Sequence, residues 1–267
     1  MSLALLRHTW RTNRLRLLAV CVALFAWGLL LPTIYSQFGA TFRDIFESGI
    51  FPEAFANFGG GDIFTLSGSI ALGFIHPIAL ILLSVFAVGF TTSSIAGELQ
   101  RGTFEILLSR PLSRRTIYST DLVAALGFVA LAMTAFLAGG LVSAALWNVI
   151  GEIDLGLVPL AWLNGLFLFG SFAAIGLAAS VTFDRLSTAL GVTLAILLVS
   201  YFFEVLGSLW PDAEFLQPWS LFHYLETRAI LNGEADPFAF GLLGAVTLVA
   251  IGWALVVFPR RDLPAPI

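Results

Sequence analysis

The segment LRLLAVCVALFAWGLLLPTIY, residues 15–35, contains a single charged residue, Arg16, and is otherwise mostly apolar. A helix of about 20 such residues spans the ~30 Å hydrocarbon core of a bilayer. Five comparable stretches follow, so the sequence predicts an all-α integral membrane protein with six transmembrane helices. The predicted spans are residues 15–35, 69–96, 117–147, 160–183, 188–209 and 238–258, and the predicted external segments are 36–68 and 210–237.

The composition supports this fold class. Of the 267 residues, 58% are hydrophobic and only 11% are charged, whereas soluble domains are roughly one quarter charged. A soluble core could not bury so much apolar surface, but a bilayer accepts it as exterior. We therefore expect residues 1–267 to form one transmembrane domain with no large soluble domain. The first apolar segment is too long for a typical signal peptide and has no clear cleavage site, which favours an uncleaved anchor.

The arginines predict the orientation. Eleven of the thirteen lie on one side of the predicted spans, and the positive-inside rule assigns that side, with both termini, to the cytoplasm. These eleven are Arg7, Arg11, Arg14, Arg16, Arg101, Arg110, Arg114, Arg115, Arg185, Arg260 and Arg261. The chain contains no lysine, which favours a GC-rich or halophilic prokaryotic source and thus a prokaryotic cell membrane.

The residue inventory excludes several chemistries. Without lysine, the chain cannot form a standard P-loop or a lysine Schiff base. Cys21 is the sole cysteine, and the three histidines fall in three different segments. We therefore expect no catalytic site, no metal or cofactor bound by this chain, and no nucleic-acid partner.

The N-terminus has the pattern of an amphipathic interfacial helix. Leu3, Leu6 and Trp10 recur at helical spacing, and Trp10 suits the headgroup boundary. The arginines of this segment lie on a different face. A plain basic flank without a defined helix is the alternative.

Two predicted external segments are too apolar for free loops. Thr41–Phe58 carries five phenylalanines and precedes the flexible Gly59–Gly61 turn. Trp219, Phe222 and Tyr224 predict a short helix that dips back toward the membrane. Either segment could gate a substrate path or only shield the bundle.

The connection between the second and third spans, residues 95–115, combines charges with apolar side chains. Thr103–Ser109 could form about two helical turns, ended by Pro111, and Ser113 could cap the next helix. An apolar ridge containing Phe104 and Leu107 would then face the cytosol. Such a ridge suits docking on another protein or burial in the interface, and the composition does not separate the two.

This connection also resembles a known family. Ala96-Gly97-Glu98, Arg101-Gly102-Thr103 and Leu107-Leu108-Ser109-Arg110-Pro111-Leu112-Ser113-Arg114 are similar to the signature of ABC-type-2 permeases. Phe51-Pro52-Glu53 and Phe58-Gly59-Gly60 are similar to the external loop of many members. The outline of six spans continues over nearly the whole chain. Leu99-Gln100 departs from the family, in which charged residues are frequent at these positions.

The resemblance implies a permease subunit that pairs with a second copy or a sister permease and binds a separate ABC ATPase, which supplies ATP and Mg²⁺. It implies a cytoplasmic coupling helix at Arg101–Arg110 and an N-terminal elbow helix. The residues implied in ATPase docking are Glu98, Arg101, Gly102, Thr103, Phe104, Glu105, Leu107, Leu108 and Arg110, and those of the elbow helix are Arg7, Trp10, Arg11 and Arg14.

The expected function is ATP-driven export of a hydrophobic or amphipathic substrate. An ion-coupled transporter is the main alternative and would use Glu204, His76 or Asp121. An intramembrane enzyme, using Ser67 or Ser69 with His76, and a membrane scaffold are further alternatives. Small-residue pairs such as Gly191 and Ala195 could pack helices within the chain or at a dimer seam.

Overall fold

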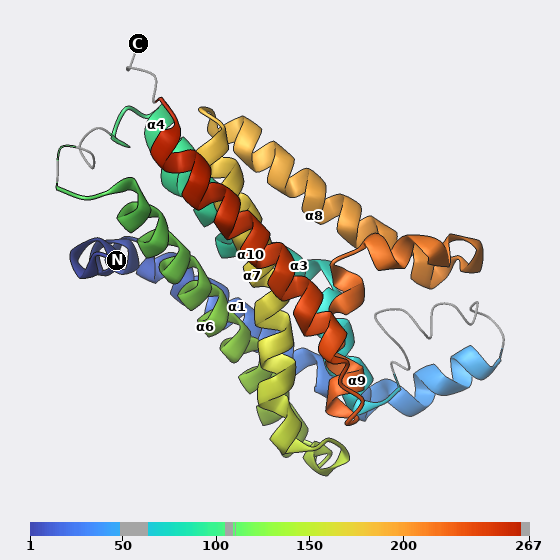
Figure 1. Cartoon of the computed structure of the whole chain (residues 1–267). Helices are drawn as coiled ribbons and strands as arrows, with labels where there is room; N and C mark the ends of the chain where they lie inside the picture. Colours follow the sequence, from blue (N-terminus) through green and yellow to red (C-terminus); the bar gives the residue numbers. More distant parts are fainter. Residues whose placement is uncertain (49–63, 105–108, 110, 263–267) are drawn as a thin grey trace.

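The protein is a helical bundle (Figure 1). The computed structural model describes residues 1–48, 64–104, 109 and 111–262, and these contain helices and connecting turns but no strand. The predicted all-α fold class is confirmed. The five long helices are α1 Leu3–Glu47, α6 Arg114–Leu146, α7 Val158–Thr182, α8 Leu186–Leu209 and α10 Pro237–Arg260.

The second predicted span is a broken helix. It consists of α2 Leu66–Ile75 and α3 Pro77–Ser84, followed by the π-helices η2 Val85–Phe90 and η3 Ser93–Gly97 and by α4 Glu98–Gln100. The axis bends by 51° between α2 and the segment that starts at Pro77. Within the described residues, five helices are long and apolar enough to cross a membrane, and the bent pair makes six.

Pro77 explains the bend, because it has no N–H to donate to the Gly73 carbonyl. The indole N–H of Trp27, on α1, donates to that carbonyl oxygen at 3.1 Å. His76 caps the new helix through its Nδ1, which accepts from the Ile78 amide at 3.3 Å, and its ring lies 4.6 Å from that of Trp27. Unpaired backbone groups are costly in hydrocarbon, so these two side chains stabilise the break.

Close backbone contact joins α1 to α6. A Cβ at Gly28 would overlap the Phe136 carbonyl oxygen, and a Cβ at Gly139 would overlap the Phe25 carbonyl oxygen. Both glycines are buried. Small residues permit this approach, which maximises van der Waals contact where no hydrophobic force joins helices.

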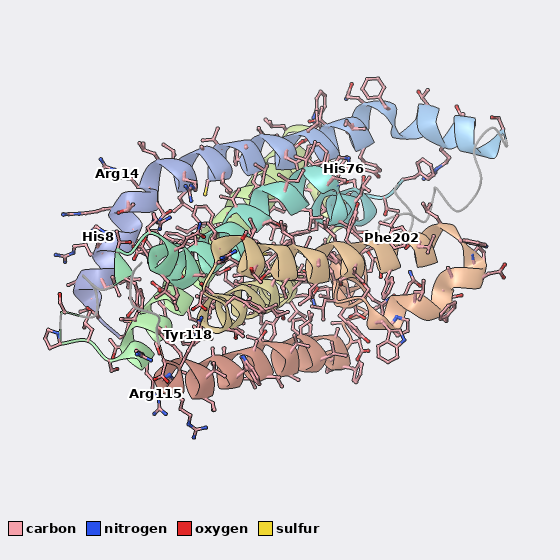
Figure 2. All side chains as sticks on the ribbon, turned by 90° about the horizontal axis from the view of Figure 1, so that it is seen from above. His8, Arg14, His76, Arg115, Tyr118 and Phe202 are labelled. Atoms are coloured by element: carbon pink, nitrogen blue, oxygen red, sulfur yellow. The ribbon has the colours of Figure 1, made fainter. Side chains whose placement is uncertain are left out.

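The N-terminal segment is continuous with the first span. The predicted interfacial helix and residues 15–35 belong to the single helix α1, which continues past Tyr35 to Glu47. Figure 2 shows α1 changing direction between the labelled residues His8 and Arg14. Trp10 rests against Phe128 of α6, with ring centroids 4.8 Å apart. The predicted Gly59–Gly61 turn, and most of the predicted loop Thr41–Phe58, lie outside the described residues.

The segment between α8 and α10 returns into the bundle. It forms two 3-10 helices, η6 Pro211–Trp219 and η7 Phe222–Tyr224, and the short helix α9 Thr227–Leu231. Phe222 is buried against Phe172 of α7 and Tyr201 of α8. The segment therefore packs against the bundle as several short turns, whereas the sequence predicted one short helix; its position relative to the membrane stays a prediction. Trp219 is the exception, because it is 79% exposed.

A methyl group added at Gly139 tests the α1–α6 contact. We expect Gly139→Ala to lower the free energy of unfolding by about 1–3 kcal/mol, because the backbones must separate. Gly252→Ala on α10 is the matched control, since nothing lies within 4 Å of its added Cβ. Equilibrium unfolding in detergent micelles measures both variants. Equal stability of the two variants would contradict the close contact.

A double-mutant cycle tests the account of the break. Trp27→Phe should cost about 1 kcal/mol, because it leaves the Gly73 carbonyl without its donor. In a Pro77→Ala background, the restored amide can donate to that carbonyl, so the same substitution should cost less. The coupling energy is read from unfolding of the four proteins. Strict additivity would show that the indole N–H and Pro77 are unrelated.

Candidate functional site

The connection after the second span begins with a fixed turn. Gly102 has a φ of 70°, a left-handed conformation that favours glycine. Its amide donates to Leu99 O at 3.0 Å, and the Thr103 amide donates to Glu98 O at 3.1 Å. These two bonds form a Schellman motif, which ends α4 and satisfies its last carbonyls.

Side chains reinforce this turn. The Glu98 carboxylate accepts from the Arg101 guanidinium at 2.5 Å and from the Thr103 hydroxyl. The Arg101 side chain remains 54% exposed. The structure thus places four of the implied docking residues in one ordered and partly exposed turn: Glu98, Arg101, Gly102 and Thr103.

Gln100 links the turn to another membrane helix. Its Oε1 accepts from the Leu186 amide at 3.0 Å, in the first turn of α8. The side chain of Arg185, at the N-cap position of α8, makes no capping hydrogen bond. Gln100 therefore supplies the cap from a distance of 86 residues in sequence. In the sequence, position 100 stood out only as a departure from the charged residues that are frequent there in the resembling family.

Phe104 corrects the prediction of an exposed apolar ridge. It is 1% exposed and packs near Phe258 of α10, with ring centroids 6.1 Å apart. Its cluster also includes Ile95, Ile117 and Tyr118. Burial of an aromatic side chain within its own chain lowers the free energy, because it removes apolar surface from water. The remaining implied residues of the ridge, Glu105, Leu107, Leu108 and Arg110, lie outside the described residues.

Two arginines bind backbone carbonyls at the end of the bundle where the Glu98–Thr103 turn lies. Arg114, at the start of α6, donates to Phe258 O at 3.0 Å and to Arg261 O at 2.5 Å. Arg261 donates to Val181 O at 2.6 Å and pairs with Asp184. They therefore satisfy the terminal carbonyls of α10 and α7. Ser113 caps α6 by accepting from the Thr116 amide at 3.1 Å, as predicted.

The π-helices contact α7 through a serine. The Ser180 Oγ accepts from the amides of Ile95 at 3.2 Å and Ala96 at 2.8 Å, and it donates to Thr92 O at 2.8 Å. Ser180 is fully buried. A π-helix changes the register of backbone pairing, and Ser180 supplies the partners at this change. Ser180 was not among the residues predicted from the sequence.

The implied elbow residues lie in the first turns of α1. Arg7, Arg11 and Arg14 are exposed, and Trp10 is half-buried. The amide of Ser2 donates to the Thr120 hydroxyl of α6 at 3.0 Å, so the chain start is held beside α6. Figure 2 shows His8, Arg14 and Arg115 at one end of the bundle.

The residues of the alternative functions do not assemble. Glu204 lies at the far end of α8, near η6 and η7, whereas Asp121 lies close enough to Glu98 for their charges to interact. The Ser69 hydroxyl donates to Leu66 O within its own helix. Among the described residues, no hydrogen bond joins Ser67 or Ser69 to His76, and no group of three or more potential ligands could hold a metal ion.

These features define a class of protein: a multi-pass α-helical membrane protein with an ordered connection after a broken second span. A family model described as ABC-2 family transporter protein matches residues 6–263. The chain therefore belongs to the ABC-2 transporter family and is a membrane component of ABC transport systems. A comparison with curated proteins finds no match.

Removal of the Ser180 hydroxyl tests how the broken span is held. We expect Ser180→Ala to destabilise the chain by about 1–3 kcal/mol, because two buried amides and one carbonyl lose their partner. Ser187→Ala, at an exposed position on α8, is the control. Hydrogen exchange should also accelerate at Ile95 and Ala96. Unchanged exchange at these two amides would contradict the assigned role.

Proposed function

We propose that the chain is the permease subunit of an ATP-driven exporter, and that a separate ABC ATPase docks on the turn Glu98–Thr103 and the residues that follow it. The observation that carries the proposal is that this segment is attached to several membrane helices. The partner would supply the site for ATP and Mg²⁺. This chain would respond to movements of the partner and would not itself catalyse a reaction.

The attachments give a physical route for movement. Gln100 holds the start of α8, and Phe104 packs on the end of α10. Arg114 then ties α10 to α6. A force applied to the turn would therefore reach three helices through hydrogen bonds and packed side chains, which transmit displacement because protein interiors are densely packed.

A second permease copy, or a sister permease, is part of the proposal. Gly191, Ala195 and Phe202 lie on an exposed stripe of α8, and a Cβ added at Gly191 would meet no atom within 4 Å. Gly170 differs, because its Cβ would lie 3.2 Å from Leu126 inside the chain. The stripe on α8 therefore suits a small-residue contact between subunits. The family resemblance favours the first and fifth spans for this seam.

The exported substrate is proposed to be hydrophobic or amphipathic, as the apolar surfaces of the bundle suggest. The distribution of arginines supports an orientation with both termini in the cytoplasm, and the absence of lysine supports a prokaryotic plasma membrane. The bent N-terminal part of α1, with its exposed arginines, is compatible with an elbow in the inner interface.

Co-purification with an ATPase tests the proposal. The tagged chain, extracted in mild detergent, should retain a P-loop ATPase in roughly one-to-one ratio. Arg101→Glu should weaken this association at least tenfold, because it reverses an exposed charge in the turn while the backbone cap remains. Phe104→Asp is a poor probe, since it would disrupt the buried cluster instead.

The matched control is Arg260→Glu, another exposed arginine at the same end of the bundle but outside the turn. It should retain the ATPase. If the wild-type chain retains no ATPase, or if both reversals weaken the association equally, docking at the turn is wrong.

A further inference from the structure

A cavity of about 350 Å³ lies at the end of the bundle opposite the Glu98–Thr103 turn. It is bounded by the end of α8, by η6 and η7, and by α9, which Figure 1 shows far from α4. Neither the family description nor the proposed ATPase docking assigns a role to it. Its volume falls in the range of small-molecule sites.

Glu204 is the buried charged group of this cavity. It is 6% exposed, and its Oε1 accepts from the Gln217 side-chain amide at 3.3 Å. Within the described part of the chain, no hydrogen-bond donor reaches its Oε2. His223 Nδ1 lies 3.7 Å from that oxygen, which is too far for a hydrogen bond. A buried carboxylate with an unpaired oxygen is costly unless the group is protonated or a cation pairs with it.

The surrounding charge is negative. The cavity lining includes three carboxylates, those of Glu204, Glu214 and Glu226, against the single guanidinium of Arg228. Burial lowers the pKa of His223, which favours its neutral form near neutral pH. A cation is favoured here, and an anion is not.

The lining is also partly apolar. Ile75, Phe222 and Leu225 contribute hydrocarbon surface beside the carboxylates. A small inorganic cation would leave this apolar surface exposed to water. In addition, no group of three or more potential ligands for a metal ion occurs among the residues described. An organic cation satisfies both parts, because its charged group can meet Glu204 while its body covers the apolar wall.

We propose that this cavity binds an organic ammonium ion with a compact apolar body, and that the ammonium group pairs with the Glu204 carboxylate. Binding at this position does not depend on an ATPase partner, so it is measurable on the isolated full chain. Failure of ATPase docking would leave it unaffected.

The probe is radiolabelled 2-phenylethylammonium, bound to the purified full chain in an uncharged detergent at pH 7 and measured by equilibrium dialysis. Unlabelled 2-phenylethanol, which has a similar shape without the charge, should compete at least tenfold more weakly than the unlabelled amine. Phenylacetate should not compete.

Glu204→Gln should weaken binding at least tenfold, because it removes the charge and preserves the side-chain size. Asp212→Asn is the control, since it removes an exposed carboxylate of η6 that does not line the cavity. Ala229→Leu is an independent test, because it fills the cavity without changing any charge. It should also weaken binding.

Equal competition by the alcohol and the amine would overturn the proposal, because it would indicate simple partition into apolar surface or detergent. Wild-type affinity in Glu204→Gln would also overturn it. If that variant does not fold, as judged by size-exclusion chromatography, the Ala229→Leu variant and the competition series decide the matter.

Discussion

The backbone of the second span needs hydrogen-bond partners that its own helix does not supply, and the rest of the structure depends on how this need is met. In hydrocarbon, an unpaired amide or carbonyl costs several kcal/mol. Trp27 of α1 satisfies the Gly73 carbonyl at the break, and Ser180 of α7 satisfies the Ile95 and Ala96 amides within the π-helix η3. The broken span is thus held between two neighbouring helices. Because the turn at Glu98–Thr103 directly follows this span, these contacts also determine where the turn lies.

The run Thr91–Ser94 shows how local chemistry supports this irregular helix. All four hydroxyls donate to carbonyls of the preceding turn, at 2.7–3.0 Å. Such bonds compete with the regular backbone pattern and are associated with bent helices. Single π-helical turns inside helices are frequent at functional sites, so this irregularity is compatible with the proposed transmission of a displacement along the span.

The sequence predicted the features that depend on composition and spacing. Apolar runs indicated the membrane helices, and Ser113 indicated the start of α6. It did not predict the partners of individual polar groups. Gln100 caps a helix 86 residues away, and Phe104 is buried among side chains from three other helices, so neither role is encoded in local periodicity. The long continuous α1 was also missed, because a change from basic to apolar residues alters the environment of a helix without interrupting its backbone.

The two proposed sites lie at opposite ends of one helix. Gln100 caps the first turn of α8, and Glu204 lies in its last two turns. The 24 residues of α8 span about 36 Å at the usual rise per residue. Ser200 holds the re-entrant segment to the same helix, because its hydroxyl accepts from the Leu221 amide at 2.7 Å. A rigid displacement of α8 that begins at Gln100 would carry Glu204 with it. Cation binding at the cavity and movement of the turn would then be linked through a rigid element, and linkage requires that each bias the other equally.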